Sequence, residues 1–202
     1  MAQSGLRNLS LGTTALPVVI VLAAGLGERF RAAGGMQHKL DARLGPRSVK
    51  EHVLHAVRHS GLPWHVVERS DTAHLNHPGM GDSIAAGVTA TAGARGWLIL
   101  PGDLPLIRAD TLQRVAQQLM SLPPGQHTVQ PHFQSQRGHP VGFAAPCEAA
   151  LRALQGDEGA RRVLRQWPPM LLDVEDEGTV WDVDTPERLA QAELRMNGER
   201  GI

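Results

Sequence analysis

The strongest structural signal in the chain is the run Val18-Val19-Ile20-Val21-Leu22-Ala23-Ala24-Gly25-Leu26-Gly27-Glu28-Arg29-Phe30. Its first five residues are apolar and mostly β-branched, which is typical of a strand buried on both faces of a parallel sheet. The strand leads into a loop of small residues, whose backbone N–H groups can approach phosphate oxygens because little side chain blocks them. The basic residues Arg29 and Lys39 follow. The run therefore predicts a triphosphate-binding loop, and the alternative is an ordinary strand-to-helix turn with solvated cations.

The glycine pattern of this loop argues against two common phosphate-binding motifs. Position 30 is Phe, so the G-x-G-x-x-G fingerprint of dinucleotide-binding proteins is incomplete. The G-x-x-x-x-G-K-[ST] motif of P-loop ATPases and kinases is also missing from the sequence. A different class of nucleotide-binding protein is indicated.

Length and composition narrow the class further. The 202 residues suit one α/β domain, which we expect at 17–196, between a mobile N-terminal tail at 1–16 and a C-terminal tail at 197–202. The 20 basic and 20 acidic residues balance, so there is no charge excess for nucleic acid or for a membrane surface. Cys147 is the only cysteine, which excludes an internal disulfide and a multi-cysteine zinc site. No apolar run approaches the roughly 18 residues that span a bilayer, and a cytoplasmic protein fits these features.

Strand-like and helix-like patterns alternate along the rest of the chain. We expect strands at 62–67, 97–100, 128–131, 141–143 and 170–174, with 128–131 and 141–143 forming a β-pair. We expect helices at 49–60, 83–91, 109–120, 147–154, 159–166 and 186–196. Asp82 or Ser83 is the predicted cap of the second helix, and Thr185 that of the last. This order predicts an α/β fold: a single three-layer, Rossmann-like domain with a mostly parallel sheet.

Three carboxylates fall where such sheets bind their ligands, at the carboxyl ends of strands. Asp103 follows the strand 97–100, and Asp182 and Asp184 precede the last helix. If 182–184 is extended, the two side chains share a face. Together with Asp103 they would hold Mg²⁺, whose other ligands are water and phosphate oxygens. The alternatives are a turn residue at 103 and a helix cap at 184.

Six short motifs occur in one order: Leu22-Ala23-Ala24-Gly25-x-Gly27-x-Arg29-Phe30, Gly79-Met80-Gly81-Asp82-Ser83-Ile84-Ala85-Ala86-Gly87, Pro101-Gly102-Asp103-Leu104-Pro105, Arg137-Gly138-His139-Pro140-Val141-Gly142-Phe143, Gly156-Asp157-Glu158-Gly159-Ala160-Arg161 and Asp182-Val183-Asp184-Thr185-Pro186-Glu187. In this order they resemble the molybdenum-cofactor nucleotidyltransferases, specifically the CTP:molybdopterin cytidylyltransferase branch, which is related to molybdopterin guanylyltransferase. The resemblance covers about residues 17–195.

This resemblance implies the transfer of a nucleoside monophosphate from an NTP to the phosphate of molybdopterin, with release of pyrophosphate and with Mg²⁺ as cofactor. Arg29, Lys39 and Asp103 would be catalytic, and Asp103, Asp182 and Asp184 would bind the metal. The acceptor would contact Arg137, Gly138, His139 and Asp157. The nucleotide would contact Leu22, Ala23, Ala24, Gly25, Gly27, Arg29, Lys39, Gly81, Asp82, Ser83 and Gly102.

The resemblance favours CTP as the nucleotide. Ala24 stands where the guanylyl branch has glycine, and its methyl group restricts the room near the base. The alternatives are a GTP-using enzyme, a sugar-phosphate nucleotidyltransferase, and a non-catalytic carrier that binds the nucleotide or molybdopterin. The resemblance also implies a transient contact with a molybdoenzyme or its chaperone.

Two segments depart from the family pattern. Eight residues, 31–38, separate Phe30 from Lys39, so this loop is longer than usual. Only eleven residues, 68–78, separate Val67 from Gly79, whereas a crossover helix to a parallel strand needs about a dozen or more. We therefore predict that one helix is lost there and that the edge of the sheet is altered. Outside the motifs, His52, His55 and His59 have helical spacing, which fits a half-buried helix face better than a metal site.

Overall fold

The structure is a computed structural model that describes residues 16–198. The predicted tail at 1–16, except its last residue, lies outside the described residues, as do residues 199–202. Within 16–198, no helix has the length and apolar character needed to cross a membrane.

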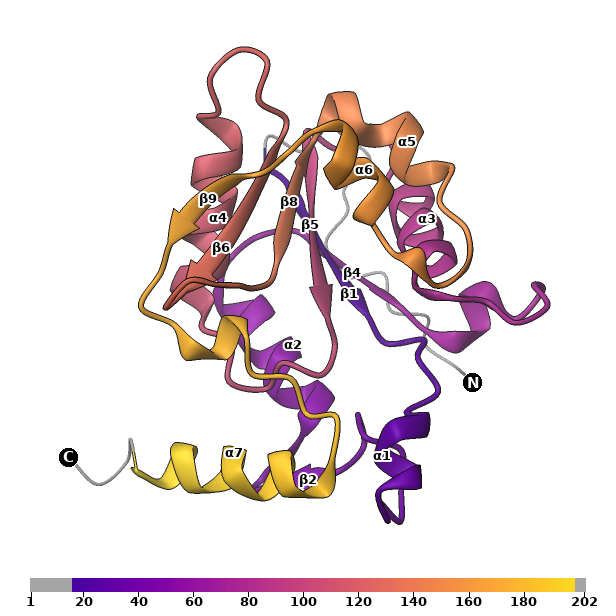
Figure 1. Cartoon of the computed structure of the whole chain (residues 1–202), viewed down its shortest axis with the longest axis vertical. Coiled ribbons are helices and arrows are strands. Elements are labelled where there is room, and N and C mark those ends of the chain that lie inside the picture. The colour runs from indigo at the N-terminus through magenta and orange to yellow at the C-terminus, as the bar shows by residue number, and fades with distance from the viewer. Residues whose placement is uncertain (1–15, 199–202) are drawn as a thin grey trace.

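A seven-stranded sheet forms the middle layer of the fold (Figure 1). Its order is β4 (Trp64–Val67), β1 (Val18–Leu22), β5 (Gly96–Pro101), β8 (Val141–Ala144), β6 (Thr128–Phe133) and β7 (Gln136–Arg137), with β9 (Met170–Asp173) paired to β6. β1 is parallel to β4 and β5, and β9 is parallel to β6, whereas β8 is antiparallel to both β5 and β6. Five strands thus run in one direction, which confirms the mostly parallel sheet.

Helices cover both faces of this sheet (Figure 1). α2 (Val49–His59) and α4 (Ala109–Met120) pack on one face, and α3 (Met80–Ala90), α5 (Glu148–Arg152) and α6 (Arg161–Gln166) pack on the other. α1 (Glu28–Ala32), the hairpin of β2 (Arg43–Leu44) and β3 (Arg47–Ser48), and α7 (Pro186–Gly198) lie together beyond one end of the sheet. The predicted three-layer α/β architecture is therefore confirmed.

The alternation of β1 explains why its sequence is apolar at every position. Val19 and Val21 face α2 and α4, while Val18 and Ile20 face α3 and the helices beside it. All four are completely buried. Burying one such side chain contributes about 1.5–3 kcal/mol. The strand is therefore fixed in the interior of the sheet, between β4 and β5, and the loop that follows it is fixed with it.

Most predicted elements form, and their ends show where local signals fail. The helix at 109–120 has the predicted bounds, and Thr128 and Val129 pair with Phe143 and Gly142 in the predicted β-pair. The predicted start of α3 is wrong: the helix begins at Met80, because the Asp82 carboxylate accepts the Gly79 N–H (2.8 Å) from inside the first turn. α7 continues to Gly198, beyond its predicted end.

The short segment between β4 and α3 contains no α-helix in the described structure. Its only regular element is a 3-10 turn at Arg69–Thr72, and β4 is the edge strand of the sheet. α3 then serves as the crossover from β4 to β5. The missing helix predicted from the length of this segment is confirmed.

Candidate functional site

A large cleft opens at the carboxyl ends of the parallel strands β1, β4 and β5. Its volume is about 1190 Å³, which exceeds the roughly 300–1,000 Å³ of a pocket for one small molecule and leaves room for two substrates. The wall comes from the loops after these three strands, from the start of α3, from β7 and from the segment before α7. Because these strands are parallel, their carboxyl ends meet at one edge of the sheet, as the sequence predicted.

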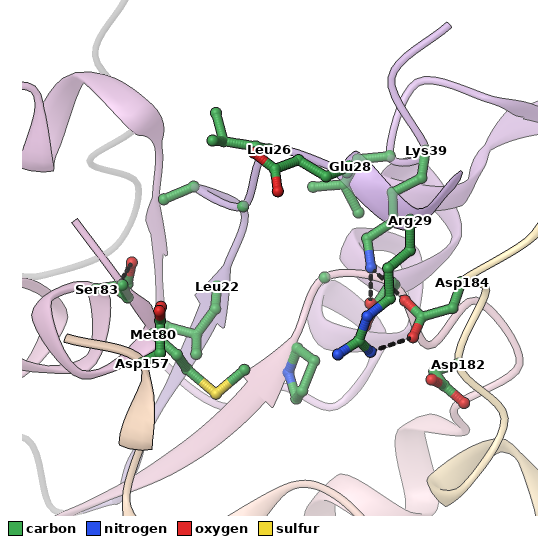
Figure 2. Close-up of a pocket in the computed structure, with 18 of the residues that line it drawn as sticks. Leu22, Leu26, Glu28, Arg29, Lys39, Met80, Ser83, Asp157, Asp182 and Asp184 are labelled. Atoms are coloured by element: carbon green, nitrogen blue, oxygen red, sulfur yellow. Dashed lines mark hydrogen bonds and ion pairs between the residues drawn. The ribbon is translucent and has the colours of Figure 1, made fainter. Parts of the chain in front are cut away.

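An ion-pair cluster lies on one side of this cleft (Figure 2). The Lys39 Nζ donates to Asp103 Oδ2 (2.5 Å) and to Asp184 Oδ1 (2.7 Å). Arg29 Nη1 donates to the other oxygen of Asp184 at 3.2 Å. The side chains of Lys39 and Asp103 are each 16% exposed, whereas Arg29 is 86% exposed. The lysine is therefore held in place, and the arginine is free to reach a ligand in the cleft.

The charges of the cluster stabilise one another. Burial alone lowers the pKa of Lys39, but the neighbouring carboxylates of Asp103 and Asp184 outweigh it and raise that pKa above its usual value. Burial alone raises the pKa of Asp184, but Lys39 and then Arg29 outweigh it and lower that pKa. Lys39 is therefore a cation and Asp184 an anion at neutral pH.

Backbone contacts fix the positions of these side chains. The Gly102 N–H donates to Leu22 O (2.9 Å), which joins the ends of β5 and β1 beside Asp103. The Val183 N–H donates to Asp103 O (2.9 Å), which brings the segment before α7 to the end of β5. Leu40 and Val183 are both buried in one apolar cluster, so Lys39 and Asp184 approach from two anchored segments.

The three carboxylates predicted to bind a metal do not converge. Residues 16–198 contain no group of three or more Asp, Glu, His or Cys placed to hold a metal ion. Asp182 lines the cleft, but its carboxylate pairs with Arg188 at 3.3 Å, and the same guanidinium binds Asp182 O (3.2 Å). Arg188 lies in turn over the Trp181 ring at 3.8 Å, so Asp182 has an ion-pair partner on α7.

Asp103 and Asp184 nevertheless fit a divalent cation. Their carboxylate oxygens both contact one positive group, the Lys39 Nζ, so they already form a cation-binding pair. Two carboxylates, completed by water and phosphate oxygens, are the ligand set that Mg²⁺ prefers. These two residues could hold the metal, and Asp182 takes no part in the pair.

The Gly79–Ser83 motif has a bracing role that sequence reasoning missed. A Cβ at Gly79 would lie 2.3 Å from the Gly156 carbonyl carbon, and one at Gly81 would lie 2.8 Å from Gln155 O, so only glycine fits. The Asp82 carboxylate accepts the N–H groups of Gly79 and Gly156, both at 2.8 Å. Gly81 and Asp82, predicted to bind the nucleotide, are absent from the cleft wall and instead hold the loop that carries Asp157.

Asp157 lies on the side of the cleft opposite the cluster (Figure 2). It lines the wall next to Met80 and Ser83, the second of which is predicted to contact the nucleotide. Arg137 and His139, which were predicted to contact the acceptor together with Asp157, line the same cleft. Asp82 and the start of α3 hold the backbone of the 156–158 turn. This contact determines the position of Asp157.

The other predicted residues divide between the wall and the supporting structure. Ala24, Gly25, Gly27, Gly102, Arg137 and His139 line the cleft, as does Leu22. Ala23 is buried, and its N–H extends the sheet by donating to Val67 O (2.9 Å). Gly138 donates to Pro131 O (2.8 Å) within the β6–β7 region. Ala23 and Gly138 therefore support the site from behind the wall.

Part of the wall was missed by the sequence analysis. The segment after β4 contributes Arg69, Ser70, Thr72, Ala73, Leu75, His77 and Pro78. These residues follow the predicted strand 62–67, so the rule that ligands bind at strand carboxyl ends could have found them. Their sequence shows no motif, which is why they were overlooked.

The three spaced histidines of α2 form a helix face without a metal site. His52 is buried, and its Nε2 lies 2.8 Å from Leu44 O. His55 and His59 stack on each other with ring centroids 4.0 Å apart. The interpretation as a half-buried helix face is consistent with these contacts.

His139 should make the stability of the protein depend on pH. Burial lowers the pKa of His139, and the nearby Asp103 offsets this only in part. Below about pH 6.5 the unfolded chain binds a proton at this histidine that the folded protein does not bind. The free energy of unfolding therefore has its full value above this pH and falls as the pH decreases. One proton gives a slope of at most about 1.4 kcal/mol per pH unit. Urea unfolding between pH 7 and 5 should show this slope, and His139→Asn should flatten it; an unchanged slope in the variant would exclude His139 as its source.

Comparisons with known proteins show the family and the fold of the chain. Residues 19–171 match the MobA-like NTP transferase domain family. Purine catabolism protein PucB of Bacillus subtilis is 31% identical over 169 residues, which cover 78% of this chain and 80% of PucB. Among solved structures, a nucleotidyl transferase of Methanothermobacter thermautotroptrophicus has a TM-score of 0.71 at 18% identity and covers 91% of this chain and 100% of its own. Rv0371c of Mycobacterium tuberculosis has a TM-score of 0.70 at 20% identity, with coverage of 91% and 100%, and was also solved in complex with manganese.

The matched residues include β1 with the loop and the helix that follow it, the carboxylate after β5, and the β6–β8 pair. It covers more than half of the chain, and the solved structures share the fold over nearly all of it. The protein belongs to the MobA-like NTP transferase family of nucleotidyltransferases.

Proposed function

We propose that the protein transfers CMP from CTP to the phosphate of molybdopterin and releases pyrophosphate. The observation that carries this proposal is the cluster of Lys39 with Asp103 and Asp184 at the end of β1 and β5. It combines a fixed cation for phosphate with two carboxylates for a divalent metal, in a cleft large enough for two substrates.

The reaction needs positioning and charge stabilisation more than covalent chemistry. An oxygen of the acceptor phosphate attacks the α-phosphorus of the NTP, and the bond from that phosphorus to the pyrophosphate oxygen breaks. Lys39 and the exposed Arg29 neutralise the negative charge around the reacting phosphates. The loop after β1 binds the leaving pyrophosphate through its N–H groups.

A divalent metal held by Asp103 and Asp184, Mg²⁺ in this proposal, would supply further positive charge at the phosphates. Support comes from the fit of the two carboxylates to one cation and from the manganese complex of Rv0371c, which shares the fold. Arg137 is exposed on β7 at the cleft wall, and it suits the acceptor phosphate because a guanidinium pairs with phosphate through two hydrogen bonds.

The choice of CTP rests on Ala24. Ala24 lines the cleft, and in this proposal its methyl group takes space in which a glycine would leave room for a larger base. The steric difference of one methyl group supports selectivity of about ten- to two-hundredfold between nucleotides.

Calorimetry with CTP, GTP, ATP and UTP, each with and without Mg²⁺, tests the nucleotide. We expect CTP to bind most tightly and only CTP binding to depend strongly on the metal. Preference for GTP would contradict the choice of base and favour the guanylyl reaction. Binding to none of the four would contradict the proposed function.

A turnover assay then separates an enzyme from a carrier. CTP and freshly prepared molybdopterin should yield pyrophosphate in equal amount to the cytidylated product. Tight binding of both substrates without pyrophosphate release would show a carrier. Release with a sugar phosphate in place of molybdopterin would identify a different acceptor.

A further inference from the structure

The loop after β1 is anchored from outside the cleft through two successive carbonyl groups. His38 Nε2 lies 2.7 Å from Gly25 O, and Arg31 Nη2 donates to Leu26 O at 3.2 Å. Both side chains come from the long segment that separates Phe30 from Lys39. His38 and Arg31 are absent from the cleft wall, whereas Gly25 and Leu26 belong to it.

The contacts of His38 define the proton position on its ring. A carbonyl oxygen only accepts hydrogen bonds, so the Nε2 facing Gly25 O carries the hydrogen. Nδ1 lies 3.4 Å from the Leu40 N–H and accepts from it. The ring thus connects the loop to the backbone that carries Lys39, and both of its nitrogens are used.

These anchors determine which way the loop N–H groups point. In a trans peptide the C=O and the following N–H point in opposite directions, and the only cis peptide among the described residues precedes Pro140. Because Gly25 O and Leu26 O are held outside the cleft, the N–H groups of Leu26 and Gly27 point in the opposite direction, into the cleft. Among residues 16–198, no acceptor binds these two N–H groups. Gly27 (φ 65°) has the left-handed conformation that this turn needs.

We propose that His38 is a positioning residue for the triphosphate: its bond to Gly25 O keeps the loop N–H groups directed at the phosphates of the NTP. This inference rests on the proposed function, because it assigns His38 to the phosphate half of the same site. His38 does not touch the substrate. It acts through the backbone of Gly25 and Leu26, from its place at the end of the long segment between Phe30 and Lys39.

The test is the affinity of His38→Leu for three probes, CTP, CMP and inorganic tripolyphosphate, measured by calorimetry with Mg²⁺. Losing the anchor should weaken CTP and tripolyphosphate by about tenfold, the effect of one well-placed hydrogen bond. CMP, which lacks the two outer phosphates, should change by less than about twofold. His38→Gln keeps an N–H donor at similar reach and should restore most of the CTP affinity.

His59→Leu is the matched control. Its ring nitrogen also bonds a backbone carbonyl, His55 O at 2.8 Å, but it lies on α2, outside the cleft. It should leave the binding of all three probes unchanged.

The outcomes separate this inference from the proposed function. If the wild type binds CTP and tripolyphosphate but His38→Leu binds them equally well, the positioning role is wrong and the nucleotide site stands. Equal losses for CTP and CMP, or no rescue by Gln, would also overturn it. If the wild type binds neither CTP nor tripolyphosphate, the proposed function itself fails.

Discussion

Asp103→Asn should lower the turnover of nucleotidyl transfer at least about a hundredfold, the usual effect of removing one charge-stabilising group. Asp103 supplies one of the two carboxylates of the cation-binding pair and hydrogen-bonds Lys39 (2.5 Å). The amide has a similar shape and keeps an oxygen for Lys39, but it loses the negative charge that a divalent metal requires. The fold should stay intact, because the bond between Asp103 O and the Val183 N–H belongs to the backbone.

Pyrophosphate release, measured under saturating CTP and acceptor, gives the turnover, and thermal unfolding checks the fold. Asp173→Asn is the control, since this carboxylate is 93% exposed and lies at the end of β9, outside the cleft wall. Unchanged turnover in Asp103→Asn would remove Asp103 from the mechanism. A large drop in the control would mean that the assay reports a general charge effect.

Lys39→Met should lower turnover by about a hundredfold or more and also weaken CTP binding. Within residues 16–198 the ammonium is the only group that bonds both Asp103 and Asp184, and it is the fixed cation of the site. Without it, Asp103 loses its cationic partner and Asp184 keeps only the exposed Arg29, so the added negative charge at the cleft opposes a triphosphate. Lys39→Arg keeps the charge with a different shape, so it should recover CTP affinity more than turnover.

Turnover and the dissociation constant for CTP are both needed for this variant. Lys50→Met is the matched control: it removes the chain's other lysine, which pairs with Glu68 at 3.3 Å and does not line the cleft. We expect the control to keep both values. If Lys39→Met loses turnover but keeps CTP affinity, Lys39 acts only on the reacting phosphates; if it keeps both, the cluster has no role in the reaction.

Local sequence patterns predicted the layers of the fold and the position of the site. The apolar run at 18–22 could only be a doubly buried strand, and the helix at 109–120 has one apolar stripe. Once the strands were assigned as parallel, their carboxyl ends had to meet, which placed the 24–29 loop and Asp103 at one edge. The missing helix between β4 and α3 followed from chain length alone.

Partner choice among side chains was predicted less well. Asp82 looked like a nucleotide ligand, but its carboxylate binds the N–H of Gly156, 74 residues away. Asp182 is predicted to bind metal, and the structure adds an ion-pair partner, Arg188 of α7, that the sequence did not indicate. In both cases a competing partner, brought close by packing, satisfies a group that sequence alone leaves free.

The sequence by itself determined the α/β fold, the order of its elements and the edge of the sheet where the cleft lies. These features follow from hydrophobic periodicity and segment length, which are local properties of the chain. Only the tertiary structure decided which charges meet. Lys39 and Asp184 are 145 residues apart, and their contact depends on Leu40 and Val183 packing into one core. The hydrogen bond between His38 and the Gly25 carbonyl likewise depends on the tertiary structure. The packing around the His38 ring sets its direction, and no sequence motif indicates this contact.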